Sequence, residues 1–171
     1  MKNTDTRERV LKLLFNYPLR GFHVREISRL LKISPPAISK AIKQLEKENL
    51  ISISKKFLYE IKANLENQEF RNMKRVHNLK SIYDSGLFSY LKESSPLGAI
   101  ILFGSYSRGD DTEKSDIDIA IEGKDKKLIL EEYEKKLNRR INIEFIEFRN
   151  ISKELTDNII NWIILSGYII T

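Results

Sequence analysis

A short apolar run at residues 99–103 leads directly into a Gly-Ser pair at 104–105, and ten residues later into an Asp-Ile-Asp triplet at 116–118. The run has the length of a buried strand, and residues 116–121 alternate isoleucine with acidic or small side chains, as a strand with one buried face does. Gly104 permits a sharp turn and a close approach of another group to the backbone. The feature therefore predicts two strands connected through a glycine turn, with acidic side chains at the start of the second.

The two aspartates of the triplet predict a metal site. Asp116 and Asp118 stand two residues apart in the expected strand, so they point to the same face about 7 Å apart along the backbone. Carboxylate oxygens suit Mg²⁺ or Mn²⁺, and the metal keeps positions for triphosphate oxygens. Ser105, at the start of a helical turn, offers its hydroxyl and amide to a phosphate. Arg108 is a further candidate for the triphosphate, with a solvated loop arginine as the alternative.

The C-terminal part of the chain, residues 96–171, is predicted to form one domain. Alternating strand and helix patterns of this kind build a small mixed sheet that is covered by helices. The expected elements are a strand at 99–103, a short helix, a strand at 116–121, a helix at 128–137, a strand at 141–148 and a helix at 159–165.

The net charge of +6 is unevenly distributed along the chain. Residues 1–64 hold 14 Lys or Arg against 6 Asp or Glu, whereas residues 65–171 hold 16 against 18. Such a concentrated positive charge is typical of a segment that binds a polyanion, and a generic solubilising charge is the alternative.

Residues 1–64 are predicted to begin with three amphipathic helices. The first runs from Asp5 to the Tyr-Pro pair at 17–18, and the second begins near His23. Ser34, followed by two prolines, marks the N-cap of the third. The last two helices, joined by a turn of about three residues, form a helix-turn-helix.

Two short strands at residues 50–53 and 57–61 are expected to follow as a β wing. Helix, helix-turn-helix and hairpin in this order resemble the winged helix-turn-helix family, especially its bacterial and archaeal transcription factors. In such modules the second helix of the pair enters the major groove of duplex DNA. A protein-binding role for the winged helix is the alternative. The resemblance implies DNA contacts from Ala37, Ser39, Lys40 and Lys43 on that helix, and from Lys55 and Lys56 at the wing tip.

Residues 65–95 are predicted to form a pair of helices that links the two domains. Apolar residues recur there at spacings of three or four, with a break at a Ser-Gly pair at 85–86. A stripe of this kind packs either against the chain's own domains or against a second copy, so a homodimer is one of two expectations. The stripe comprises Phe70, Met73, Val76, Leu79, Ile82 and Tyr83.

The Gly-Ser pair, the ten-residue spacer and the Asp-x-Asp triplet resemble the signature of the minimal nucleotidyltransferases of the DNA polymerase β superfamily. The runs LFGSYSRGDDTEKSDIDIAI and NIINWIILSGY look particularly like archaeal proteins that join a winged helix to such a domain. The resemblance implies an α+β protein that uses Mg²⁺ and transfers a nucleoside monophosphate from an NTP. The family usually has a third carboxylate on a neighbouring strand, where this chain has Asn142. Glu144, on the same strand face, is the candidate to replace it as metal ligand or base.

Two classes of function follow from these observations. The first is an enzyme that transfers a nucleotide, AMP from ATP, onto a protein hydroxyl. Minimal family members act as antitoxins that adenylylate a partner toxin of the HEPN ribonuclease class. The second is a DNA-binding regulator whose C-terminal domain senses nucleotide without catalysis. Transfer to a small molecule such as an aminoglycoside is weaker, because little sequence remains to build a pocket for it.

The composition excludes several other classes. The chain has no cysteine, which excludes a disulfide framework, a thiolate zinc site and a thiol nucleophile. No apolar run approaches the roughly 18 to 20 residues that cross a bilayer, and no signal-peptide pattern follows Met1. We therefore expect a cytoplasmic protein without a membrane partner.

Overall fold

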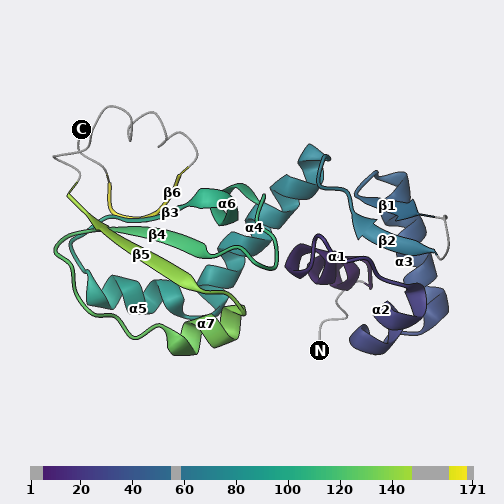
Figure 1. Cartoon of the computed structure of the whole chain (residues 1–171), viewed down its shortest axis with the longest axis horizontal. Helices are drawn as coiled ribbons and strands as arrows, with labels where there is room; N and C mark the ends of the chain where they lie inside the picture. Colours follow the sequence, from purple (N-terminus) through teal and green to yellow (C-terminus); the bar gives the residue numbers. More distant parts are fainter. Residues whose placement is uncertain (1–5, 55–58, 148–161, 169–171) are drawn as a thin grey trace. The chain divides into compact units, whose positions relative to one another are not determined.

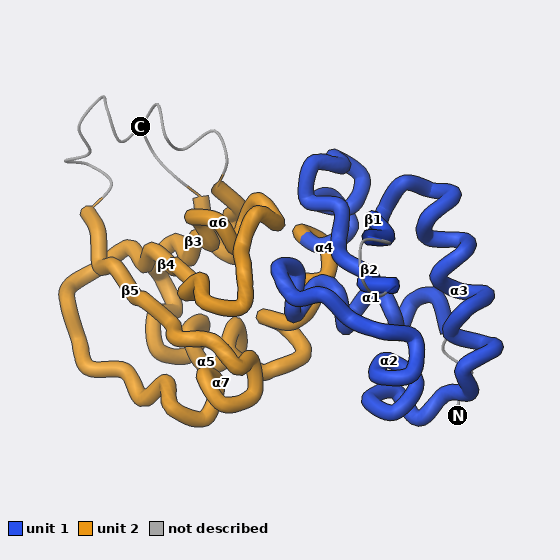
Figure 2. The backbone as a smooth tube through the Cα atoms, turned by 45° about the vertical axis from the view of Figure 1, so that its right-hand side comes forward, with its two compact units in different colours: residues 1–74 blue, residues 75–171 orange. Residues whose placement is uncertain are grey.

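The computed structural model describes residues 6–54, 59–147 and 162–168. The chain divides into two compact units, residues 1–74 and residues 75–171 (Figure 2). The first unit is mainly helical and the second contains a mixed sheet, so the expected α+β class is confirmed. No helix within the described ranges is both long and apolar enough to span a bilayer.

The first unit contains the three predicted helices, which are α1 (Thr6–Asn16), α2 (Val24–Leu31) and α3 (Pro35–Lys47) (Figure 1). The turn between α2 and α3 is tight. Lys32 ends α2 in the left-handed conformation, and Ser28 Oγ donates to the carbonyl of Ile33 at 2.5 Å. Ser34 is the N-cap of α3 with an extended backbone, which matches the prediction from the following prolines.

The predicted wing is present as an antiparallel hairpin of β1 (Ile51–Ser54) and β2 (Glu60–Ala63). The second strand begins later than the predicted 57–61, of which residues 57 and 58 lie outside the described ranges. The pairing register sets these bounds. Ile61, which is buried in the core of this unit, pairs with Ile53, and the strand therefore continues to Ala63, which lies opposite Ile51.

The core of the first unit is formed by one face of each helix and by the hairpin. Burying apolar side chains of this size stabilises the fold by about 1.5 to 3 kcal/mol each. The core also includes Phe70 from the next helix, whose ring lies 5.1 Å from that of Phe15. Other members are Val10, Leu11, Leu14, Phe22, Ile27, Ile38, Ala41, Ile42, Leu45, Leu50, Ile51, Ile61 and Ala63.

The predicted helix pair is also present, as α4 (Gln68–Asp84) and α5 (Leu87–Ser94). Gly86 separates them with φ +84°, a left-handed conformation that favours glycine. The division between the two units falls within α4, which contributes residues 68–74 to the first unit and 75–84 to the second.

The predicted apolar stripe along α4 is partly wrong. Val76 and Tyr83 are 68% and 45% exposed, whereas Asn78 is buried. Side chains four residues apart lie on the same helix face, and the buried row follows that spacing. A polar side chain can occupy such a row when it is hydrogen-bonded, as Asn78 is. The row consists of Phe70, Lys74, Asn78 and Ile82.

The second unit is built on a four-stranded sheet in the order β5-β4-β3-β6. Strand β4 pairs with β5 in parallel, and β3 pairs with both β4 and β6 antiparallel. The strands are β3 (Ile100–Phe103), β4 (Ile117–Glu122), β5 (Ile141–Ile146) and β6 (Ile163–Ser166). Two short helices connect them, α6 (Gly104–Arg108) between β3 and β4 and α7 (Glu131–Leu137) between β4 and β5.

Two predicted helix assignments in this unit need correction. Residues 163–165, expected at the end of a helix, lie in strand β6, while residues 159–161 lie outside the described ranges. Consecutive isoleucines favour a strand, and the free edge of β3 supplies the pairing partner. The helix expected at 128–137 begins only at Glu131, where three acidic residues occupy the first turn.

The two faces of the sheet differ. One face packs against α5 and α7, which lie on the same side of the sheet in Figure 1. The isoleucines at 117, 119 and 121 of β4 point to this side. On the opposite face, Ala99, Ile101 and Ala120 form a smaller cluster with Phe103 and Trp162 at its border. Because strand side chains alternate, Asp118 belongs to this second face.

Candidate active site

The predicted aspartates lie at the start of the central strand β4. Asp118 is paired in register with Phe103 on β3 and with Asn142 on β5, so it stands between both neighbouring strands. Asp116 directly precedes the strand and is exposed. The next residue, Ile117, donates its N–H to the carbonyl of Arg140 at 2.9 Å, which holds the backbone beside Asp116 against β5.

Gly104 lies so close to Asp118 that a side chain at residue 104 would displace the Asp118 carboxylate. A Cβ on Gly104 would lie 2.3 Å from Asp118 Oδ2, well inside van der Waals contact. The glycine also has φ +70°, in the left-handed region that L side chains rarely adopt. The glycine of the motif and the second aspartate of the triplet are therefore neighbours in space, as the predicted turn requires.

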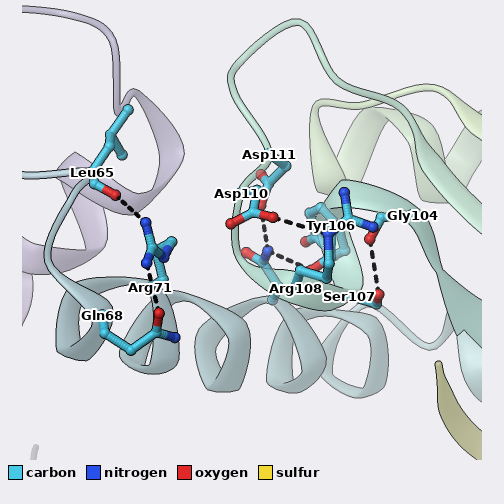
Figure 3. A network of polar contacts seen from close by, with 10 residues as sticks. Leu65, Gln68, Arg71, Gly104, Tyr106, Ser107, Arg108, Asp110 and Asp111 are labelled. Atoms are coloured by element: carbon cyan, nitrogen blue, oxygen red, sulfur yellow. Dashed lines mark hydrogen bonds and ion pairs between the residues drawn. The ribbon is translucent and has the colours of Figure 1, made fainter. Parts of the chain in front are cut away.

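The Gly-Ser pair begins the five-residue helix α6 at the end of β3. Ser105 is half-buried, and Ser107 Oγ donates to the carbonyl of Gly104 at 2.8 Å (Figure 3). Gly109 ends the helix in the left-handed conformation. The exposed Arg108 forms an ion pair with Asp110 at 2.9 Å, so an NTP would have to compete for this guanidinium.

The position expected for a third carboxylate is occupied by an amide. Asn142 Nδ2 lies 3.4 Å from Asp118 Oδ1 across the β4–β5 pair. Glu144 is exposed on the same face of β5, but its register partner is Ala120, one pleat beyond Asp118. Within the described ranges, no three Asp, Glu, His or Cys side chains are grouped so that they could hold a metal ion.

A buried polar network lies behind the Gly-Ser turn. Asn78 of α4 donates through Nδ2 to the carbonyl of Tyr106 at 2.9 Å and to Asp111 Oδ1 at 2.6 Å. All three residues are at most 5% exposed. Burial raises the pKa of the Tyr106 phenol well above its ordinary value, and the nearby Asp111 carboxylate raises it further. Sequence reasoning missed Asn78, whose only signal was a polar residue within a helix expected to be a packing element.

A wide polar cleft of about 740 Å³ lies beside Asp116, at the end of the sheet where β4 and β5 begin. Its walls come from the segment before β4, from α7 and from the turn before β5. Opposite charges alternate along it, so it suits a polar or charged group. The lining residues are Glu113, Lys114, Ser115, Asp116, Glu131, Glu134, Lys135, Asn138, Arg139 and Arg140.

These residues fit a divalent cation. Asp116 and Asp118 are hard oxygen donors, the type that Mg²⁺ and Mn²⁺ prefer. Gly104 leaves the Asp118 carboxylate the space that a side chain would fill. Two carboxylates leave the remaining positions of an octahedral ion to water and substrate oxygens.

The predicted DNA-contacting residues of α3 lie on its outer side. Lys40 and Lys43 are exposed and form no ion pair with any residue in the described ranges, whereas Ala37 and Ser39 are half-buried. Lys55 and Lys56 lie outside those ranges. Ion pairs in the described part of this unit involve other cationic residues. These pairs are Arg7 with Glu48, Lys12 with Glu8, Arg20 with Glu26 and Lys62 with Glu60.

Comparison with known protein families agrees with this arrangement. Residues 86–166 match the family model described as polymerase beta, nucleotidyltransferase, and residues 4–52 match that of the bacterial regulatory protein, arsR family. Searches of curated proteins and of solved structures found no match. The two matches agree with an N-terminal helix-turn-helix of a DNA-binding type followed by a C-terminal nucleotidyltransferase-like domain, as the resemblance implied. A domain of the second type uses an NTP and a divalent metal ion.

Proposed function

We propose that the protein transfers AMP from ATP onto a hydroxyl group of a partner protein with the help of Mg²⁺, and that its winged helix binds duplex DNA. The observation that carries this proposal is the packing of the Asp118 carboxylate against Gly104, with Asp116 directly before the same strand. It brings together the two groups that the chemistry needs, a backbone that admits phosphate and a pair of carboxylates.

In the proposed reaction, Asp116 and Asp118 hold the metal, and the Gly104–Ser105 backbone and the Ser105 hydroxyl bind phosphate oxygens. When bound, the metal neutralises charge on the triphosphate and on the departing pyrophosphate. The acceptor oxygen forms a bond to the α-phosphorus, the bond from that phosphorus to pyrophosphate breaks, and the hydroxyl proton passes to a base. Glu144 is the proposed base.

The acceptor is proposed to be a protein surface. The cleft beside Asp116 is open and lined by charged side chains of both signs, which suits a polar polypeptide better than an apolar small molecule. A HEPN ribonuclease toxin is the proposed partner, and the protein would then act as its antitoxin. The exposed Val76 and Tyr83 of α4 leave a homodimer as a further proposal.

DNA binding is proposed for the first unit. Lys40 and Lys43 on α3 support it: both are exposed and neither forms an ion pair with a residue of the described ranges, so they can meet phosphates. A DNA partner would also imply that the protein acts in the cytoplasm.

A second candidate is a DNA-binding regulator whose nucleotidyltransferase domain senses nucleotide without catalysis. The Asn142 amide beside Asp118 favours it, because two carboxylates can bind a nucleotide with its metal, whereas a second metal or a base needs a further acid.

Incubation with each labelled NTP, Mg²⁺ and a HEPN protein tests the choice between the two. Label on the HEPN protein that requires both Asp116 and Asp118 supports the enzyme, and the Asp116→Asn and Asp118→Asn variants should lose transfer while melting like the wild type. Asp125→Asn, at an exposed acid after β4, is the matched control. Binding of Mg·NTP without transfer would favour the regulator, and unchanged transfer in both variants would contradict the proposed site.

A further inference from the structure

We propose that Asn78 is a positioning residue of the nucleotide site, because its side-chain amide bonds at two points, the Tyr106 carbonyl and the Asp111 carboxylate, to the segment that we expect to hold the NTP phosphates. The inference rests on the proposed function. The segment comprises residues 104–111 and is called the phosphate segment below. It begins at Gly104, which touches Asp118, and ends at Asp111.

The phosphate segment has little regular structure to hold it in place. Helix α6 has only five residues, and a single helical turn is unstable without tertiary contacts. At its end, both Gly109 and Asp110 donate their N–H groups to the carbonyl of Ser105. The Tyr106 carbonyl, whose partner in a continuing helix would be Asp110, is instead bonded to Asn78.

The same amide nitrogen of Asn78 also bonds to Asp111. The contact of 2.6 Å is short, as expected for a donor facing a carboxylate, and Asp111 is 1% exposed. A buried carboxylate is strongly destabilising unless donors surround it, so the contact holds Asp111 where the chain leaves the turn. Asn78 is itself only 3% exposed on α4, and a change to another rotamer would break both of these hydrogen bonds.

Hydrogen bonds then extend from this point to the glycine of the motif. Ser107, the residue after Tyr106, donates its hydroxyl to the Gly104 carbonyl and so closes the turn that contains Tyr106 (Figure 3). Gly104 in turn leaves space for the Asp118 carboxylate. A shift of the Tyr106 carbonyl would therefore move the Gly104–Ser105 backbone relative to Asp118. Asp118 lies on β4, and Asp116 directly precedes this strand, which is held by its pairing with β3 and β5 and forms no hydrogen bond with Asn78 within the described ranges.

Because Asn78 holds the phosphate segment and the sheet holds β4, loss of Asn78 should affect nucleotide binding more than the transfer rate. Asn78→Ala should weaken Mg·ATP binding at least about 10-fold, which corresponds to about 1.4 kcal/mol, while the transfer rate at saturating ATP stays within about threefold. Asn78→Asp should weaken binding further, because it places a second carboxylate beside Asp111. Combining Asn78→Asp with Asp111→Asn restores a donor and acceptor pair, and it should recover part of the loss.

Calorimetric titration with Mg·ATP and hydrogen exchange of the apo protein are the two measurements. Asn78→Ala should raise exchange of residues 104–111 and leave β4 protected. Asn72→Ala, at an exposed asparagine of the same helix, is the matched control. If Asn78→Ala does not fold, Asp111→Asn, which keeps the side-chain shape but removes the charge, serves as the second variant.

Unchanged ATP affinity and unchanged exchange in a folded Asn78→Ala protein would overturn the proposal, as would an equal loss of binding and of saturated rate. If the wild type binds no nucleotide at all, the proposed function fails. The exchange measurement then decides separately whether Asn78 orders the phosphate segment.

Discussion

Asn142 and Asp118 face each other across the parallel pair of β5 and β4, with the amide nitrogen of one 3.4 Å from a carboxylate oxygen of the other. The amide can donate a hydrogen bond to the aspartate but adds no negative charge. The contact therefore places an amide, instead of a third carboxylate, directly beside Asp118.

Asn142→Asp should convert this contact into a third carboxylate. Without metal, repulsion from Asp118 should lower the melting temperature, and Mn²⁺ should restore it by more than it stabilises the wild type, since stabilisation grows with affinity. Transfer should rise about 10-fold or more if a second metal is limiting. Melting curves with and without Mn²⁺ and a transfer assay measure both effects. A variant with weaker metal stabilisation than the wild type would contradict the role given to this position.

Glu144→Gln should slow transfer by about 10² or more, because general-base catalysis typically contributes about 10² to 10⁴ in rate. Binding of Mg·NTP should change little, since Glu144 lies beside Ala120 rather than Asp118. Single-turnover rates and calorimetry separate the two effects. Glu147→Gln, beyond the end of β5, is the control, and a retained rate in the Glu144 variant would assign the base to another acid.

Gly104→Ala should abolish transfer by displacing the Asp118 carboxylate. The left-handed backbone adds about 1 to 2 kcal/mol of strain, which a thermal melt should detect. Gly123→Ala is a matched control, because Gly123 also has positive φ but a Cβ there would meet nothing within 4 Å. The control should lose stability and keep activity. Equal activity in both variants would show that the contact with Asp118 is not required.

Duplex DNA binding by the full chain should depend steeply on salt. Each phosphate contact contributes about −0.9 to the slope of log K against log salt, so Lys55→Ala with Lys56→Ala should flatten the slope by up to about 2. Lys12 and Lys80, which are ion-paired with Glu8 and Asp84, provide a control pair of alanine substitutions. Fluorescence anisotropy at several salt concentrations measures the slopes. A slope near zero for the wild type would assign the winged helix to protein contacts.

The sequence by itself determined the helices of the first unit, the helix pair and strands β3, β4 and β5. These elements have local causes that a sequence displays: a Ser-Pro-Pro start for α3, a glycine break at Gly86, and alternating isoleucines in β4. The Gly-Ser and Asp-x-Asp motifs could also be recognised from the sequence, because their residues stand at a short, fixed spacing along the chain.

Only the tertiary structure decided which residues meet. Strand β6 forms where a helix was expected, because the edge of β3 pairs with it. Asn78 is buried on α4 while Val76 is exposed, because the acceptors on Tyr106 and Asp111 lie on one side of the helix alone. The contact between Asn142 and Asp118 depends on the register of two strands separated by α7. Hydrophobic periodicity shows which face of a helix or strand is apolar. The partners of a buried polar group come from segments distant in sequence, so no local pattern predicts which residues they are.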